Sequence, residues 1–301
     1  VARDPDFALG WSGLADAIDG LAYRDARAQA LVPRAKLAAQ RAVLLDPDLA
    51  EGWASWGVLA FEADRDWTTA ELALKRAVAL KPSYAWARAS LGDMLRLQGR
   101  VQEAIEQQRM ALELDPLSPQ SHSTLGLSLL VARQWDEART QYEASAASGG
   151  ETGALPTFMT SGAEMGLTAD EIAEHAVSFA RVMGASDPEG VRVLGPALAG
   201  GSLDEELVAS ARESVATLIA DGVLTLQLIA GLYTKLGDHD TALDWLETLT
   251  GGGSLSAGIV GVDPALDPLR GNPRMQALMD ELGLPNGYDP AADTYEPEGT
   301  L

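Results

Sequence analysis

Large apolar residues recur at steps of three and four between residues 50 and 116, with small residues at fixed places among them. This spacing puts the apolar side chains on one face of a helix, so it predicts amphipathic α-helices. The stretch holds two similar copies, because Gly57 aligns with Gly92 and Ala70 with Ala104, at offsets of 35 and 34 residues. We therefore expect a unit of two helices that repeats along the chain.

The small residues and prolines of each copy have separate structural roles. A small side chain lets two helices approach closely, and a proline cannot continue a helix. A further copy, at 117–150, keeps the small residues but ends in Gly149-Gly150 instead of proline. The structural positions that we assign are Gly57, Ala70, Pro82, Gly92, Ala104, Pro116, Gly126 and Ala138.

A period of about 34 residues in helix-forming sequence is typical of tetratricopeptide (TPR) repeats. The predicted fold is all-α: a right-handed TPR solenoid of antiparallel helix pairs. One unit cannot bury its apolar faces alone, whereas stacked units can, and stacking leaves a concave face on which a partner can bind.

The pattern divides the chain into four parts. Residues 1–150 contain about four regular TPR repeats, the first with an insertion within 19–33. This insertion indicates a longer helix pair or, in the functional alternative, a lid or partner loop. Residues 151–222 predict degenerate helical repeats, 223–285 a TPR-like repeat with a capping helix, and 286–301 a flexible acidic tail.

Capping signals predict several helix ends after residue 150. Thr168 begins a helix that continues to about Met183, and Asp187 begins another that ends near Leu198. Ser202 and Glu205 form a capping box for the next helix. The capping helix begins near Pro273 and ends before Gly283.

Composition narrows the function classes. The chain has 301 residues with a net charge of −22, which argues against a nucleic-acid or anionic-membrane surface. Cysteine is absent, so no disulfide or thiolate metal site exists. No apolar run is long enough to span a bilayer, and we expect no membrane insertion by this fragment. The opening Val1-Ala-Arg-Asp-Pro5 resembles the end of a repeat, so we expect a fragment of a longer protein.

Candidate chemistry is sparse. His122 occupies a position that points toward the core, His175 lies on an ordinary helix, and His239 lies in a turn between two acids. No nucleophile elbow, phosphate-binding loop or metal-binding motif is present. We expect no enzyme activity, no catalytic residue, no cofactor and no metal.

The candidate site is the groove lined by the first helix of each TPR unit. Counting from the small position selects Leu9, Ser12 and Asp16 in the first copy. A carboxylate-binding groove needs several converging Lys and Arg side chains, and only Arg96 is available. The mixed set favours a peptide with apolar anchors and basic residues. The predicted groove residues are Glu51, Phe61, Glu62, Trp86, Asp93, Arg96, Gln120 and Ser123.

Two stretches carry a resemblance to a narrower family. The repeats from Phe7 to Tyr142, including the Glu-Leu-Asp-Pro-Leu-Ser-Pro join at 113–119, and the motifs within 242–285 resemble the C-terminal TPR region of bacterial adenylate cyclase, winged-helix regulator and TolB-like proteins. The resemblance implies a sensory or scaffolding module attached to a separate output domain.

The sequence therefore predicts a scaffold or regulatory module that binds a protein or peptide, as part of a larger bacterial signalling protein, with self-association as a further mode. Two alternatives stay open: a stand-alone assembly or secretion adaptor, and a small-molecule sensor that uses residues 151–222. The cytoplasm is the favoured compartment, and the periplasm applies if an upstream part carries a membrane span.

Overall fold

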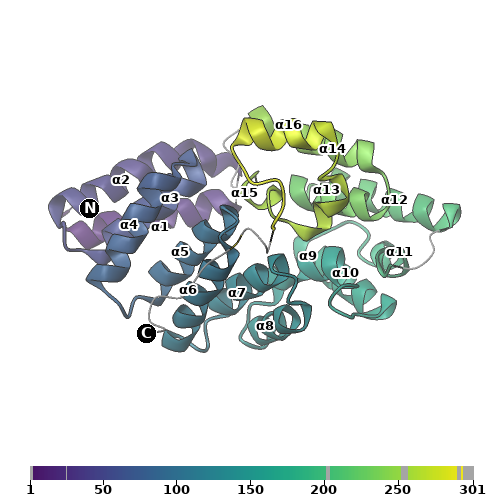
Figure 1. Cartoon of the computed structure of the whole chain (residues 1–301), viewed down its shortest axis with the longest axis horizontal. Helices are drawn as coiled ribbons and strands as arrows, with labels where there is room; N and C mark the ends of the chain where they lie inside the picture. The colour runs from purple at the N-terminus through teal and green to yellow at the C-terminus, as the bar shows by residue number, and fades with distance from the viewer. Residues whose placement is uncertain (1–2, 25, 201–203, 252–256, 290–292, 294–301) are drawn as a thin grey trace. The chain divides into compact units, whose positions relative to one another are not determined.

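The computed structural model describes residues 3–24, 26–200, 204–251, 257–289 and 293. Helices and turns account for all the regular structure in these ranges, and no strand occurs in them (Figure 1). The chain divides into two compact units between Pro116 and Leu117. The division falls inside the stretch 1–150 whose repeat pattern is regular, so the repeat at 117–150 belongs to the second unit. The predicted acidic tail lies almost wholly outside the described residues.

The first unit consists of three helix pairs. We call the first helix of each pair the A helix and the second the B helix. The pairs are α1 (Ala8–Arg24) with α2 (Val32–Leu45), α3 (Ala50–Asp64) with α4 (Trp67–Leu80), and α5 (Ala85–Leu97) with α6 (Val101–Leu114). Each B helix contacts its own A helix, and α2 and α4 also contact the next A helix. The A helices contact one another in order, α1 with α3 and α3 with α5, so they form one layer of the unit.

Small residues allow the helices of a pair to lie close together. A Cβ atom on Gly57 would lie 2.7 Å from Cγ of Leu74 and 3.2 Å from the backbone oxygen of Ala70. A Cβ atom on Gly92 would likewise lie 3.0 Å from the backbone oxygen of Ala104. The glycines thus lie at the points of closest approach, where a larger side chain would push the helices apart.

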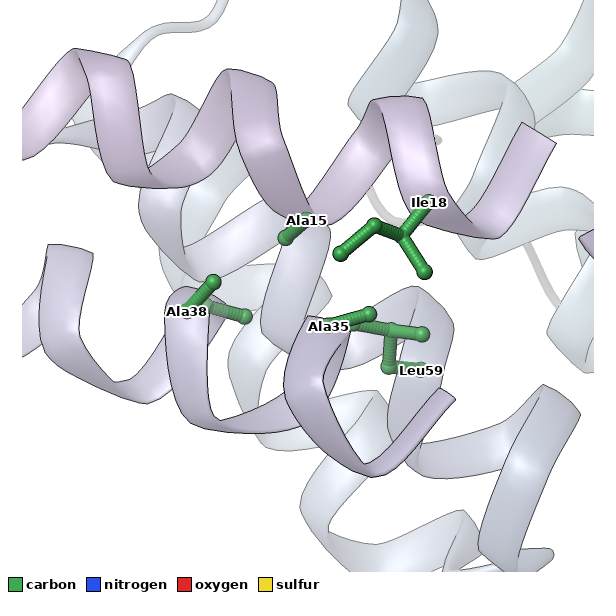
Figure 2. Packing of buried hydrophobic residues seen from close by; sticks show 6 residues of the cluster. Ala15, Ile18, Ala35, Ala38 and Leu59 are labelled. Carbon is green, nitrogen blue, oxygen red and sulfur yellow. The ribbon is translucent and has the colours of Figure 1, made fainter. Parts of the chain in front are cut away.

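The first pair uses alanine in place of glycine at its closest approach. Ala15 of α1 packs against Ala35 and Ala38 of α2, with Ile18 and Leu59 completing the cluster (Figure 2). The insertion extends this pair: α1 has 17 residues where α5 has 13, and a 3₁₀ turn (Ala26–Leu31) connects α1 to α2. The insertion thus lengthens α1 and adds the 3₁₀ turn, whereas α2 has 14 residues like α4 and α6.

A hydrogen bond that recurs in each A helix of the first unit connects the helix to the proline-containing turn before it. The indole Nε1 of Trp53 donates to the carbonyl oxygen of Pro47 at 2.8 Å, six residues earlier. Trp11 makes the equivalent bond to Pro5 at 2.8 Å. In the third pair the Nε of Arg88 donates to the carbonyl of Pro82 at 3.1 Å. One position of the A helix thus satisfies the carbonyl of the proline six residues earlier, whichever donor occupies it.

The turn between the A and B helices contains one residue in the left-handed region. Gly99 has φ +80° and Gly237 has φ +74°, as glycine allows. At the equivalent place the chain has Arg65 with φ +54° and Arg133 with φ +63°. The turn geometry is therefore set by the helix pair, and arginine adopts it at an energetic cost.

The second unit begins with a regular pair and then becomes irregular. Tyr142, in the second helix of this regular pair, is fully buried. A Cβ on Gly126, in the first helix of the pair, would lie 3.1 Å from the ring of Tyr142. The helices are α7 (Pro119–Val131), α8 (Trp135–Ala147), α9 (Glu151–Ser161), α10 (Ala169–Met183), α11 (Leu194–Leu198), α12 (Glu205–Ala220), α13 (Leu226–Lys235), α14 (His239–Glu247), α15 (Ala257–Val260) and α16 (Pro273–Leu282), with 3₁₀ turns at Gly190–Val193, Thr248–Gly251 and Pro264–Leu269.

Several predicted helix ends agree with the structure and two differ. Thr168 and Glu171 form the predicted capping box of α10, and α16 ends before Gly283. The helix expected from Asp187 is instead a 3₁₀ turn followed by the short α11, and Oδ1 of Asp187 accepts from the backbone N–H of Gly190 at the start of that turn. The capping box expected at Ser202 lies outside the described residues, and Asp204 caps α12 by accepting from the backbone N–H of Leu207.

Candidate functional site

The predicted groove residues fall in both units. Six lie on α3 and α5 of the first unit, and Gln120 and Ser123 lie on α7 of the second unit. Gln120 is exposed and Ser123 is half-buried. The six residues of the first unit are therefore considered together, and we call the exposed side of α1, α3 and α5 the A-helix face.

Two of the six are not exposed on this face. Phe61 is 5% exposed and stacks on Trp67 with ring centroids 6.4 Å apart. Arg96 is 4% exposed. Glu62, Asp93 and Trp86 are half-buried, as residues at the edge of a binding surface are expected to be.

Glu51 is engaged in an ion pair at the start of α3. Its carboxylate lies 2.7 Å from Nζ of Lys81. Burial opposes ionisation of Glu51, but the hydrogen bond and the charge of Lys81 lower its pKa below the usual value. Lys81 thus already balances the charge of the Glu51 carboxylate, and Glu51 differs in that respect from the other acids of the face.

An aromatic pair lies beside Glu51. The rings of Tyr84 and Trp86 have centroids 5.8 Å apart, and Nζ of Lys81 lies 4.9 Å from the centroid of Tyr84. Burial and the charges of Asp16 and Glu51 raise the pKa of the Tyr84 hydroxyl. The hydroxyl of Tyr84 thus lies within electrostatic range of Asp16 on α1.

Four acids from three A helices form a row across the face. We call Asp16 and Asp19 of α1, Glu62 of α3 and Asp93 of α5 the carboxyl row. Ser55 of α3 donates to Oδ1 of Asp16 at 2.6 Å, and the hydroxyl of Ser12 lies 2.9 Å from that of Ser55. Further along the row, the carboxyl of Glu62 is hydrogen-bonded to that of Asp19.

The carboxyl row resists ionisation. Burial, followed by the charge of Asp16, raises the pKa of Asp19 to about 6. Burial and the charges of Asp19 and Asp93 raise the pKa of Glu62 well above its usual value. Burial also raises the pKa of Asp16 and of Asp93, against the hydrogen bonds that these two accept. Near neutral pH the row therefore retains protons that exposed carboxyls have lost.

Among the described residues, Arg96 is the positive side chain that contacts the row. Its Nη2 donates to Oδ1 of Asp93 at 3.3 Å, and Nε2 of Gln108 approaches the same oxygen at 3.4 Å. Both distances are at the long end of hydrogen bonding. Nε and Nη1 of Arg96 and Oε1 of Gln108 are buried and have no hydrogen-bond partner. The site thus combines four carboxyl groups with buried hydrogen-bond donors and an acceptor that have no partner.

Sequence reasoning missed Tyr84 and Lys81 of this site, and it missed three residues of the carboxyl row and its contacts. Asp19 was assigned to the insertion, although counting from Ala15 gives it a groove position on a helix that simply continues. Ser55 lies at a position of the A helix that does not face the groove in a regular repeat. Gln108 lies on a B helix, where the pattern indicates core packing, and only its contact with Asp93 connects it to the face.

The histidines show no catalytic arrangement. His122 is half-buried and its Nδ1 lies 2.8 Å from Oε1 of Gln141, so it is less deeply packed than the sequence predicted. His175 stacks on Phe158 at 4.3 Å, and burial lowers its pKa. His239 is the first residue of α14. Within the described ranges, no three His, Asp or Glu side chains are placed to hold a metal ion, and no helix is long and apolar enough to cross a membrane.

No family model matches the sequence, and no curated protein matches it. Among solved structures, the chain is similar to MamA, with 24% identity over 49% of this chain and 81% of that one, at a TM-score of 0.39. It is similar to PilF of Pseudomonas aeruginosa, with 21% identity over 90% and 99% of the two chains, at a TM-score of 0.42. Human IFIT1, solved as a dimer with m7Gppp-AAAA, is 16% identical over 82% of this chain and 64% of IFIT1, at a TM-score of 0.47. The TPR-type helical-repeat architecture of this chain is evident from its own consecutive helix pairs.

Proposed function

We propose that this chain is a protein-interaction module and that the A-helix face of the first unit binds a segment of a partner protein. The observation that carries the proposal is the placement of a half-exposed aromatic pair, Tyr84 and Trp86, next to the carboxyl row on one layer of helices. Aromatic side chains supply apolar anchoring area, and charged neighbours select the partner's orientation.

The proposal is tested by capturing partners from a lysate of the source cell with three forms of the chain. Trp86→Ala removes the aromatic anchor. Leu72→Ala is the matched control, because Leu72 is 60% exposed on the B helix α4, outside the A-helix face. We expect one partner to bind the wild type and Leu72→Ala but not Trp86→Ala, with all three forms folded by circular dichroism.

Equal capture by Trp86→Ala would contradict the proposal and assign binding to another surface. The captured partner is then cross-linked to the wild type, and the cross-linked residues are mapped. Cross-links on α1, α3 and α5 support the A-helix face, whereas cross-links confined to α9–α12 would assign partner binding to residues 151–222 instead.

We also propose that the module regulates an output domain within a larger bacterial signalling protein. The resemblance at 113–119 and within 242–285 supports this role. The gene sequence upstream of the codon for Val1 tests it. A cyclase, winged-helix or membrane-anchoring segment in the same reading frame supports the role, and an independent start codon close to Val1 favours a stand-alone adaptor.

A further inference from the structure

Among the described residues, the cation that pairs with the carboxyl row is Arg96, through Asp93. The nearby Lys81 is already paired with Glu51 at 2.7 Å. Burial makes ionisation of the row's carboxyls unfavourable, and a further cation beside them would favour their ionised form.

Arg96 provides a second and independent indication of a ligand. Its Nε and Nη1 are buried without a partner, on a side chain that is 5% exposed and that contacts the row through Asp93. Unpaired guanidinium donors inside a fold are costly, and an acceptor oxygen would satisfy them. Asp93 receives only long contacts, 3.3 Å from Nη2 of Arg96 and 3.4 Å from Nε2 of Gln108, so these contacts hold it weakly.

We propose that the carboxyl row binds the cationic side chain of a Lys or Arg residue in the partner segment, while Arg96 donates to a backbone carbonyl of the same segment. This inference rests on the proposed function and specifies its ligand. A peptide combines the two required groups, a cation and a carbonyl oxygen, and the neighbouring Tyr84 and Trp86 can pack against the methylenes of a long basic side chain. The net charge of −22 favours the approach of such a segment.

A divalent metal ion fits the row less well. A metal needs several oxygens converging at short range, and within the described ranges no three acids are so placed. An alkylammonium or guanidinium group is larger and bonds through several separate donors, which suits carboxyls spread over three helices.

Cation binding at this site is linked to proton release. Among the described residues, the other polar or charged groups near the row are Ser12, Ser55, Tyr84, Arg96 and Gln108. Raised carboxyl pKa values mean that the free site holds a proton near pH 6, and a bound cation displaces it. For one linked carboxyl with a pKa of about 6, affinity increases about tenfold between pH 5 and pH 7.

The test is an NMR titration of the full chain, labelled at the side-chain carboxyl carbons of Asp and Glu. The probes are an acetylated, amidated Ala-Lys-Ala peptide, the same peptide with norleucine in place of lysine, butylamine, and Mg²⁺. We expect the lysine peptide to shift the carboxyl signals of the row, with about tenfold higher affinity at pH 7 than at pH 5, and the norleucine peptide to leave them unchanged.

Variants assign the effect to named groups. Glu62→Gln is expected to weaken lysine-peptide binding and to flatten its pH dependence, whereas Glu113→Gln, the same change at an exposed residue of α6, leaves both unaltered. Arg96→Lys keeps the positive charge but loses donors, so we expect it to weaken peptide binding severalfold without affecting butylamine. Thermal melts establish that each variant is folded.

The outcomes separate this inference from the proposed function. Equal binding of the lysine and norleucine peptides would overturn the cation site and leave the aromatic face as the binding surface. Tighter binding of butylamine or Mg²⁺ than of the lysine peptide would overturn the peptide as ligand in favour of a free amine or a metal. Unshifted carboxyl signals with every probe would overturn the site altogether, even where partner capture still depends on Trp86.

Discussion

The carboxyl of Glu62 in α3 is hydrogen-bonded to the carboxyl of Asp19 in α1, across two neighbouring helices of one layer. Two carboxyls in such a contact share a proton, since two ionised groups would repel each other. The pair connects the part of the carboxyl row on α1 to the part on α3 and α5, and we expect it to make the stability of the first unit sensitive to pH.

We expect the stability of the first unit to fall as pH increases from 5 to 7.5. Asp19 has a pKa of about 6 in the folded chain and an ordinary value of 3.8 when unfolded. The folded state therefore binds more protons in this window, and stability is greatest at the acidic end. Raising a carboxyl pKa from 3.8 to about 6 costs the ionised form about 3 kcal/mol. This value is the upper limit of the change in folding stability that ionisation of Asp19 can cause.

Asp19→Asn checks this pH dependence. The variant should be more stable than the wild type at pH 7.5, by about 1–3 kcal/mol, and the gain should shrink toward pH 5. Denaturation followed by tryptophan fluorescence is suitable, since five of the seven tryptophans precede Pro116. Glu113→Gln is the charge-matched control. A wild-type stability that increases between pH 5 and 7.5 relative to Asp19→Asn would contradict the assignment.

Gly92→Ala should destabilise the third helix pair by about 1–3 kcal/mol. The added Cβ would lie 2.6 Å from Cγ of Gln108 and 3.0 Å from a backbone oxygen of α6, and the backbone cannot move as a side-chain end can. Gly13→Ala is the control, because α1 leaves open space around that Cβ, and alanine favours a helix by up to about 1 kcal/mol. Urea denaturation of both variants gives the comparison. A loss of stability in Gly13→Ala as large as that in Gly92→Ala would show that the packing argument is wrong.

The repeat could be predicted from the sequence because its determinants are local. Gly57 and Ala70, or Gly92 and Ala104, are spaced along one helix pair, and their small size is visible in the sequence. The carboxyl row depends instead on how far each A helix rotates relative to the next. Asp19 meets Glu62 only because α1 continues straight through the start of the insertion, which the repeat count cannot show.

The same limit explains Phe61. Its position in the repeat predicted a groove residue, but its ring is buried and stacks on Trp67, and Arg96 at the equivalent position of the next repeat is buried as well. The left-handed turn at Arg65 was hidden for a related reason, since arginine carries no signal for positive φ. Alignment with Gly99 is the signal that could have revealed it.

Gly99→Ala tests the turn geometry. Glycine at φ +80° is relaxed, whereas alanine there is strained, so we expect a loss of about 1 kcal/mol. The expected sign is opposite to that of Gly13→Ala, although both variants make the same chemical change. Thermal unfolding by circular dichroism measures the difference, and an increase in melting temperature for Gly99→Ala would be incompatible with a left-handed residue at this turn.

Trp53→Phe tests the bond that joins consecutive repeats. Phenylalanine keeps an aromatic ring near Trp56, whose centroid lies 5.4 Å from that of Trp53, but it cannot donate to the carbonyl of Pro47. We expect a loss of about 0.5–1.5 kcal/mol, the usual contribution of one such hydrogen bond. Trp11→Phe removes the equivalent bond to Pro5 and should cost a similar amount. Urea denaturation followed by circular dichroism avoids the change in fluorescence that each substitution causes. If the two losses are similar and add in the double variant, each hydrogen bond contributes independently to stability, as expected for a repeat protein. No loss of stability in either variant would mean that packing alone holds each A helix against the turn before it.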